Sequence, residues 1–127
     1  MTFHFLLVGL GGAIGAMLRH GAGLMSMRVL GADFPWGTFA INIIGSLCIG
    51  IITGLLALMT AWSQEVRLFV VVGVLGGFTT FSAFSLDTIL LVERGQIVNA
   101  ALYVFGSVVL SIIAAFLGLF LMRVVAG

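Results

Sequence analysis

Four long apolar segments, separated by short breaks, occupy most of this chain of 127 residues. We expect them to cover the ranges from about Phe3 to Gly23, Trp36 to Met59, Arg67 to Leu91 and Ile97 to Val125. Each range is close to the roughly 20 residues that a helix needs to cross the hydrocarbon core of a bilayer. Only 7% of the residues are charged, which is far below the ~25% typical of soluble domains. The sequence therefore predicts an all-α integral membrane protein, with four transmembrane helices in a single domain spanning residues 1–127.

Arginines are shared equally between the two membrane sides that four antiparallel spans define. One side holds Arg67 and Arg123, and the other side holds Arg28 and Arg94. The positive-inside rule needs an excess of basic residues on one side, so it gives this chain no preferred orientation. Two interpretations stay open: a subtler cue fixes one orientation, or the chain inserts both ways and so allows an antiparallel homodimer.

Small residues recur at four-residue spacing along three of the predicted spans. The sets are Gly11 with Gly15, Gly12 with Ala16, Ser46 with Gly50 and Gly54, and Gly73 with Gly77. This spacing lets helix backbones approach each other closely in lipid. We expect these positions to lie at contacts between helices, and packing alone is enough to explain them.

Two stripes of polar residues run along the predicted spans at helical spacing. The stripes are Thr38, Asn42 and Ser46 on the second span, and Tyr103, Ser107 and Ser111 on the fourth. A single serine in a membrane helix commonly bonds back to its own backbone, which is an ordinary explanation for each residue alone. Two aligned stripes, one with an asparagine amide, instead favour the walls of a narrow polar path through the membrane.

The segment GGFTTFSAFS, residues 76–85, is a poor centre for a transmembrane helix. Its glycines and threonines have low helix propensity, so we expect the third helix to be broken near its middle. Main-chain carbonyls freed at such a break commonly coordinate a cation. Phe78, Phe81 and Phe84 follow one another at three-residue spacing. Such a stripe is usually plain packing, but the positive edges of aromatic rings can also face an anion.

Arg19 lies late in the first span. Three roles stay open for it: it snorkels to the membrane interface, it supplies positive potential at a vestibule, or it ties down a loop. The sequence has no cysteine–histidine cluster, no hydrolase-like spacing of serine, histidine and carboxylate, and no phosphate-binding glycine loop after a strand. We therefore expect no enzyme. Interior residues rich in neutral donors and poor in carboxylates favour transport of a small anion.

Three segments of the chain resemble the signatures of the Fluc (CrcB-type) fluoride ion channels. They are GGAIGAMLRH at residues 11–20, WGTFAINIIGS at residues 36–46 and GGFTTFSAFS at residues 76–85. The resemblance covers essentially all four spans. It implies a fluoride-selective channel of the cell inner membrane that exports fluoride from the cytoplasm by passive, electrodiffusive flow and gives fluoride resistance. It also implies an antiparallel, dual-topology homodimer with two pores, whose partners are fluoride, sodium and the lipid bilayer, with no nucleic acid.

The same resemblance assigns roles to particular positions. It places in the fluoride pore Asn42, Phe81, Phe84, Tyr103, Ser107 and Ser111. It assigns Arg19 to the vestibule, and gives the main-chain carbonyls of Gly76 and Thr79 to a structural sodium ion at the dimer interface. The sequence departs from the family pattern at Asp87, where glutamate is frequent, and at Ala83, where threonine is common.

Two other functions make different demands on the sequence. A small multidrug-resistance exporter needs a carboxylate within the first span to exchange protons for a cationic drug, and the first span has none. An assembly subunit without transport predicts polar residues scattered around the helices rather than aligned in stripes.

Overall fold

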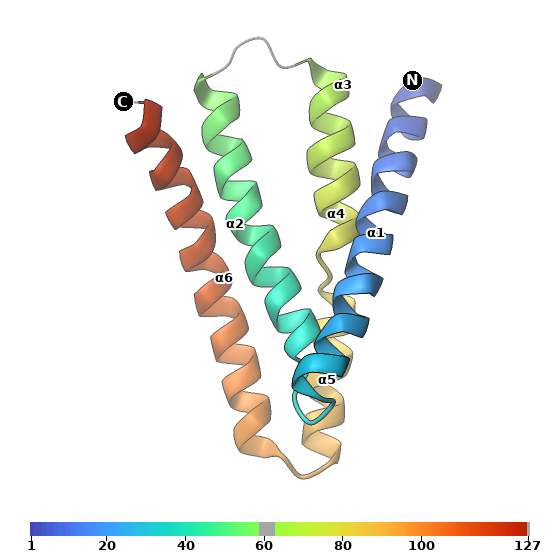
Figure 1. Ribbon diagram of the computed structural model, residues 1–127, viewed down its shortest axis with the longest axis vertical. Coiled ribbons are helices and arrows are strands. Elements are labelled where there is room, and N and C mark those ends of the chain that lie inside the picture. Colours follow the sequence, from blue (N-terminus) through green and yellow to red (C-terminus); the bar gives the residue numbers. More distant parts are fainter. Residues whose placement is uncertain (59–62, 127) are drawn as a thin grey trace.

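The computed structural model describes residues 1–58 and 63–126, which are helical apart from short connections. The elements are α1 (Thr2–Leu30), α2 (Trp36–Leu58), α3 (Gln64–Arg67), η1 (Leu68–Leu75), α4 (Gly76–Phe78), α5 (Ser82–Glu93) and α6 (Ile97–Ala126). Elements α3 to α5 follow one another as a single third span, so the chain passes up and down as four rods (Figure 1). Four helical segments are long and apolar enough to cross a membrane, which confirms the four-span prediction.

The first helix is longer than predicted. We expected the first span to end near Gly23, but α1 continues to Leu30 because its next strong helix terminator is Gly31. Gly31 has φ 83, a left-handed conformation that glycine adopts without steric cost. Arg28 therefore lies in the last helical turn, where the helix dipole favours a cation. The second helix begins at Trp36 as predicted, whereas its predicted end, Met59, lies outside the described residues.

The third span is interrupted, as the glycines and threonines predict. Helix α4 ends at Phe78, Thr79 is extended at φ −82 and ψ 158, and α5 starts at Ser82. The wider turns of the π-helix η1 precede this break. The sequence gives no signal for that π-helix, because no residue type marks the change in backbone hydrogen-bond register.

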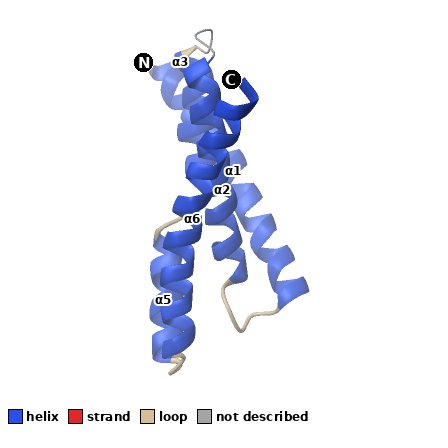
Figure 2. Ribbon diagram, turned by 90° about the vertical axis from the view of Figure 1, so that its left-hand side faces the viewer, coloured by secondary structure: helices blue, strands red, loops and turns tan. Residues whose placement is uncertain are grey.

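The third span changes its helical neighbour at the break. Before the break, η1 and α4 pack against α1, and after the break α5 packs against α6. Figure 2 shows α5 beside α6, while the end of α1 lies with the start of α2 on the opposite side. The break therefore lets one span cross from one helix pair to the other.

Glycines lie where the helix backbones approach most closely. In α1, Gly11 and Gly15 face the main chain of residues 69–78 in the third span. Between α2 and α6, Gly50 lies against the main chain of Ala115. These contacts confirm that the small residues at four-residue spacing are packing positions.

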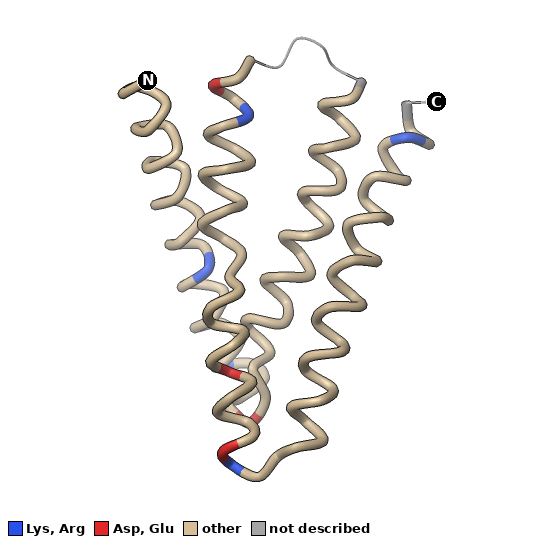
Figure 3. The backbone as a smooth tube through the Cα atoms, turned by 180° about the vertical axis from the view of Figure 1, so that it is seen from behind, with Lys and Arg blue, Asp and Glu red and all other residues tan. Residues whose placement is uncertain are grey.

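Most of the charged residues lie towards the two ends of the helical rods (Figure 3). Arg19 within α1 and Asp87 within α5 are exceptions, because each lies well inside its apolar span. Charges at such depth need partners within the protein, and both partners are found at the site described below.

We predict that Gly15→Ala destabilises the protein by about 1–3 kcal/mol, the usual cost of overpacking. The added methyl group meets main-chain atoms of Val74 and Phe78, which cannot move aside as a flexible side chain can. The control is Gly21→Ala in the same helix, where no described atom lies within 4 Å of the new methyl. Thermal unfolding in detergent measures both variants, and equal losses of melting temperature would contradict the packing role of Gly15.

Candidate functional site

A groove of about 470 Å³ lies beside the break, between α2, the third span and α6. We call it the polar groove. Its lining includes eight of the residues singled out from the sequence: Asn42, Ser46, Gly76, Thr79, Phe81, Phe84, Ser107 and Ser111. These residues come from three separate spans, so the fold brings together most of the predicted site.

Asn42 holds the broken segment in place. Its Nδ2 donates to the carbonyl of Thr80 at 2.9 Å, and its Oδ1 accepts from the Thr80 N–H at 2.9 Å. In a continuous helix that N–H would bond to the carbonyl of Gly76. The asparagine amide therefore replaces a missing helical bond, and both of its polar atoms contact the main chain.

The hydroxyls of Ser107 and Ser111 are buried without a hydrogen-bond partner among the described residues. Other hydroxyls of the chain bond back to carbonyls four residues earlier: those of Thr79, Ser85 and Thr88. The ordinary explanation for an intramembrane serine thus holds at those positions and fails at Ser107 and Ser111. Both serines belong to the lining of the polar groove.

The rings of Phe81 and Phe84 lie at the same groove, stacked with centroids 5.5 Å apart and planes 22° apart. Phe81 is 67% exposed in the single chain. Phe78 precedes the break and is not part of the described groove lining. The three phenylalanines therefore do not form one stripe, because the break interrupts the helical spacing that the prediction assumed.

The structure does not bring Tyr103 into the described lining of the polar groove. Its side chain is fully buried, and its ring packs against Phe34, Phe39 and Phe84. Its hydroxyl donates to the carboxylate of Asp87 at 3.0 Å. Tyr103 thus supplies the partner that the intramembrane acid needs.

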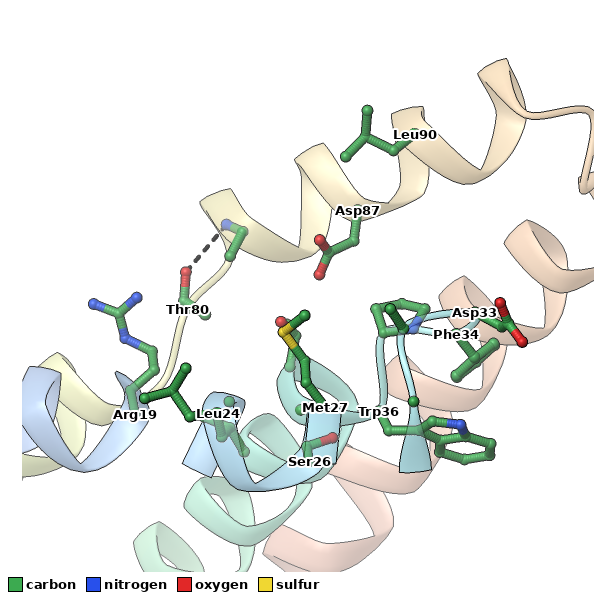
Figure 4. A pocket seen from close by; sticks show the side chains of 18 of the residues that line it. Arg19, Leu24, Ser26, Met27, Asp33, Phe34, Trp36, Thr80, Asp87 and Leu90 are labelled. Atoms are coloured by element: carbon green, nitrogen blue, oxygen red, sulfur yellow. Dashed lines mark hydrogen bonds between the residues drawn. The ribbon is translucent and has the colours of Figure 1, made fainter. Parts of the chain in front are cut away.

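A second pocket, of about 690 Å³, lies between the end of α1, the connection to α2, and α5. Arg19 and Asp87 line it, and Figure 4 shows Arg19 close to Thr80 with Asp87 projecting from α5. Arg19 Nε donates to the carbonyl of Gly77 at 3.1 Å. Snorkelling is therefore not the only role of Arg19, because it also binds the broken span. Thr80 lines both the pocket and the polar groove, so it stands between them.

Sequence reasoning missed Thr80 and Gly77 as partners within the site. Thr80 pairs with Asn42 and also accepts the N–H of Ala83 on Oγ1 at 3.1 Å, at the start of α5. The only available signal was the low helix propensity of residues 76–80. That signal predicts a break but not the side chains that satisfy its peptide groups.

Comparison with known proteins supplies a family for this arrangement. Residues 6–119 match the family described as CrcB-like protein, Camphor Resistance (CrcB). The fluoride-specific ion channel FluC 2 of Nitrobacter hamburgensis is 54% identical over 120 residues, which cover 94% of this chain and 97% of that protein. FluC of Rhodopseudomonas palustris is 55% identical over 95% of this chain and 98% of its own length. FluC of Novosphingobium aromaticivorans is 56% identical over 94% and 95%.

We predict that Asn42→Ala destabilises the protein by about 1–3 kcal/mol, the cost of leaving buried peptide groups unpaired. Asn99→Ala is the matched control, because among the described residues the Asn99 amide bonds only to the Gln96 side chain, at 3.2 Å in the first turn of α6. We expect the control to stay within about 0.5 kcal/mol of the original protein. Thermal unfolding in detergent compares them, and an intact melting temperature for Asn42→Ala would show that the break does not need this amide.

Proposed function

The chain belongs to the CrcB (FluC) family of fluoride-specific ion channels, and from this premise we propose that fluoride crosses the membrane along its polar groove. Passage by this route gives fluoride resistance by letting the ion leave the cytoplasm. The family is one of ion channels rather than enzymes. The protein is a multi-pass membrane protein with four candidate spans, and we place it in the cell inner membrane.

The unpaired hydroxyls of Ser107 and Ser111 are the observation that carries this proposal. Fluoride is small and strongly hydrated, so a selective path must replace its water with close donors. An unpaired hydroxyl in a buried wall is costly for the protein alone. Its cost is removed when an anion accepts the hydrogen bond, which makes the two serines suited to successive fluoride positions one helical turn apart.

Phe81 and Phe84 line the groove opposite these serines in the proposed path. The edges of their rings carry partial positive charge, and fluoride approaching in the ring plane is attracted without a formal cation. The remaining N–H of Asn42 adds a neutral donor next to Phe81, since its other polar contacts are with Thr80. Tyr103 acts beside this path, through Phe84 and Asp87.

Passive, electrodiffusive flow fits the neutral lining of the groove. No charged side chain belongs to its described lining. A permeant ion must bind well enough to enter and weakly enough to leave, and neutral donors meet both conditions. We assign Arg19 to a vestibule at the second pocket, where a positive charge raises the local concentration of anions before they enter the groove.

An antiparallel homodimer provides the missing wall of this path. Phe81 is 67% exposed in the single chain, and Gly76 beside it is also exposed. A second copy covering this face turns an open groove into a closed pore, and two-fold symmetry gives two pores. The equal division of arginines between the membrane sides supports insertion in both orientations.

The carbonyls of Gly76 and Thr79 suit a structural sodium ion at the same interface. The N–H groups that would pair with them in a continuous helix, on Thr80 and Ala83, are held by Asn42 and by Thr80 Oγ1. The two carbonyls are therefore left free, and neutral carbonyl oxygens at a helix break are typical cation ligands. Bound there, sodium supplies a positive centre and a link between the two copies.

We predict that purified protein in liposomes releases trapped fluoride rapidly and chloride negligibly. The physical reason is the close, neutral lining of the groove, which fits the smaller ion. Ion-selective electrodes measure both releases after the membrane potential is short-circuited with a potassium ionophore. Absence of fluoride release from folded protein would reject the channel function, and proton-coupled export of organic cations would then be the next assay.

We predict that Phe81→Ile lowers fluoride flux at least tenfold, which corresponds to about 1.4 kcal/mol in the barrier, while the dimer still assembles. Isoleucine keeps the apolar character and removes the ring edge. The control is Phe105→Ile in α6, because Phe105 is 71% exposed and does not belong to the described groove lining. Equal fluoride flux in Phe81→Ile and the original protein would contradict the proposed role of the Phe81 ring edge in the path.

A further inference from the structure

Two side chains divide the main-chain carbonyls of the break into two sets. Arg19 Nε donates to the carbonyl of Gly77 at 3.1 Å, and Asn42 Nδ2 donates to the carbonyl of Thr80 at 2.9 Å. The side-chain hydrogen bonds of the described residues do not reach the carbonyls of Gly76 and Thr79. The two bound carbonyls, of Gly77 and Thr80, are therefore three residues apart. The two free carbonyls, of Gly76 and Thr79, are also three residues apart, and each directly precedes a bound one.

We infer that Arg19 is a positioning residue for the proposed sodium site. By binding the carbonyl of Gly77, and together with Asn42 at Thr80, it fixes the peptide planes of the break so that the carbonyls of Gly76 and Thr79 stay free. This inference rests on the proposed function, because it concerns the cation held at the interface. It gives Arg19 a role at the broken span in addition to its charge at the vestibule.

The packing of α1 explains why Arg19 can do this. Gly15, one helical turn earlier, lies against main-chain atoms of Val74, Gly77 and Phe78. Gly12 faces Gly77 at the same contact. Because α1 packs directly against the end of α4, the side chain of Arg19, one helical turn after Gly15, reaches the carbonyl of Gly77. Figure 4 shows the Arg19 side chain extending alongside Thr80, the other residue whose carbonyl is bound.

A carbonyl without a donor in a membrane interior turns towards any donor it can reach. If Gly77 loses Arg19, the peptide plane that carries its carbonyl is free to rotate. The neighbouring planes, which carry the Gly76 and Thr79 carbonyls, then lose their fixed direction. A charge-assisted bond from a guanidinium is stronger than a neutral one, which suits it to holding the broken segment in one conformation.

The charge of Arg19 and its hydrogen bond act on sodium with opposite signs. A nearby positive charge repels a cation, so removal of the charge alone strengthens sodium binding. Removal of the hydrogen bond disorders the carbonyls and weakens sodium binding. The sign of the change in sodium affinity therefore separates the positioning role from a purely electrostatic one.

The test is thermal unfolding of the full-length protein in detergent over a sodium titration, with N-methylglucamine keeping the ionic strength constant. Arg19→Met removes charge and donor, whereas Arg19→Gln removes the charge and keeps a donor. Both variants lack the charge, so they differ only in the donor to the Gly77 carbonyl. We expect the half-stabilising sodium concentration of Arg19→Met to be on the order of tenfold higher than that of Arg19→Gln. Arg28→Gln in the last turn of α1 is the control, and we expect it to behave as the original protein.

A sodium midpoint in Arg19→Met that is no higher than in Arg19→Gln overturns the inference. If Arg19→Met does not fold, Arg19→Lys decides, because it keeps the charge and lacks the Nε donor. A purely electrostatic role then predicts an unchanged midpoint, and a positioning role predicts a higher one. If the stability of the original protein does not depend on the sodium concentration, both the proposed sodium site and this inference are rejected. Fluoride release from liposomes is measured separately, so a failure of the channel function is distinguishable from both results.

Discussion

The reciprocal pair of hydrogen bonds between Asn42 and the main chain of Thr80 is the interaction on which the site depends. A helix broken within hydrocarbon leaves peptide groups unpaired at high cost, and here one side chain satisfies both groups of a single residue. The break in turn sends α5 away from α1 and beside α6. The polar groove exists because the third span crosses between helix pairs at that point, carrying Phe81 and Phe84 to the serines of α6.

The four spans and the break were predictable because both depend on local composition. Length and apolarity identify a membrane helix, and the predicted starts at Trp36 and Ile97 agree with α2 and α6. The predicted end of the first helix, Gly23, was wrong by seven residues, because α1 ends at Leu30. The prediction placed the end of the span before the charged residues, whereas the helix continues until a glycine terminates it. The π-helix of η1 was not predictable, since backbone register depends on packing that no single residue type reveals.

Within the site, the spacing of residues along the sequence correctly predicted which side chains share a face of a continuous helix. The same spacing failed as a predictor where helices cross or where a helix is broken. Ser107 and Ser111 share the groove because α6 is regular, as the four-residue spacing predicts. Tyr103 belongs to the same stripe but meets α5 one turn away, where its hydroxyl finds Asp87. Phe78 is separated from Phe81 by extended backbone, so sequence spacing says nothing about their relative directions. Partnerships such as Arg19 with Gly77 depend on how α1 packs, which the sequence leaves open.

The charged residues Arg19 and Asp87 lie apart from the proposed permeation path, and a fluoride channel has a physical reason for that separation. A fixed cation in a dehydrated groove attracts fluoride strongly, and an ion held that tightly does not leave. Arg19 lines the wider pocket and is bound to a carbonyl, while Asp87 is bound to a tyrosine hydroxyl. Thr80 stands between that pocket and the neutral groove. In the proposed mechanism, positive potential gathers anions at the entrance. The polar groups of the groove are hydroxyls, an amide and ring edges, and such neutral groups release an anion as readily as they bind it.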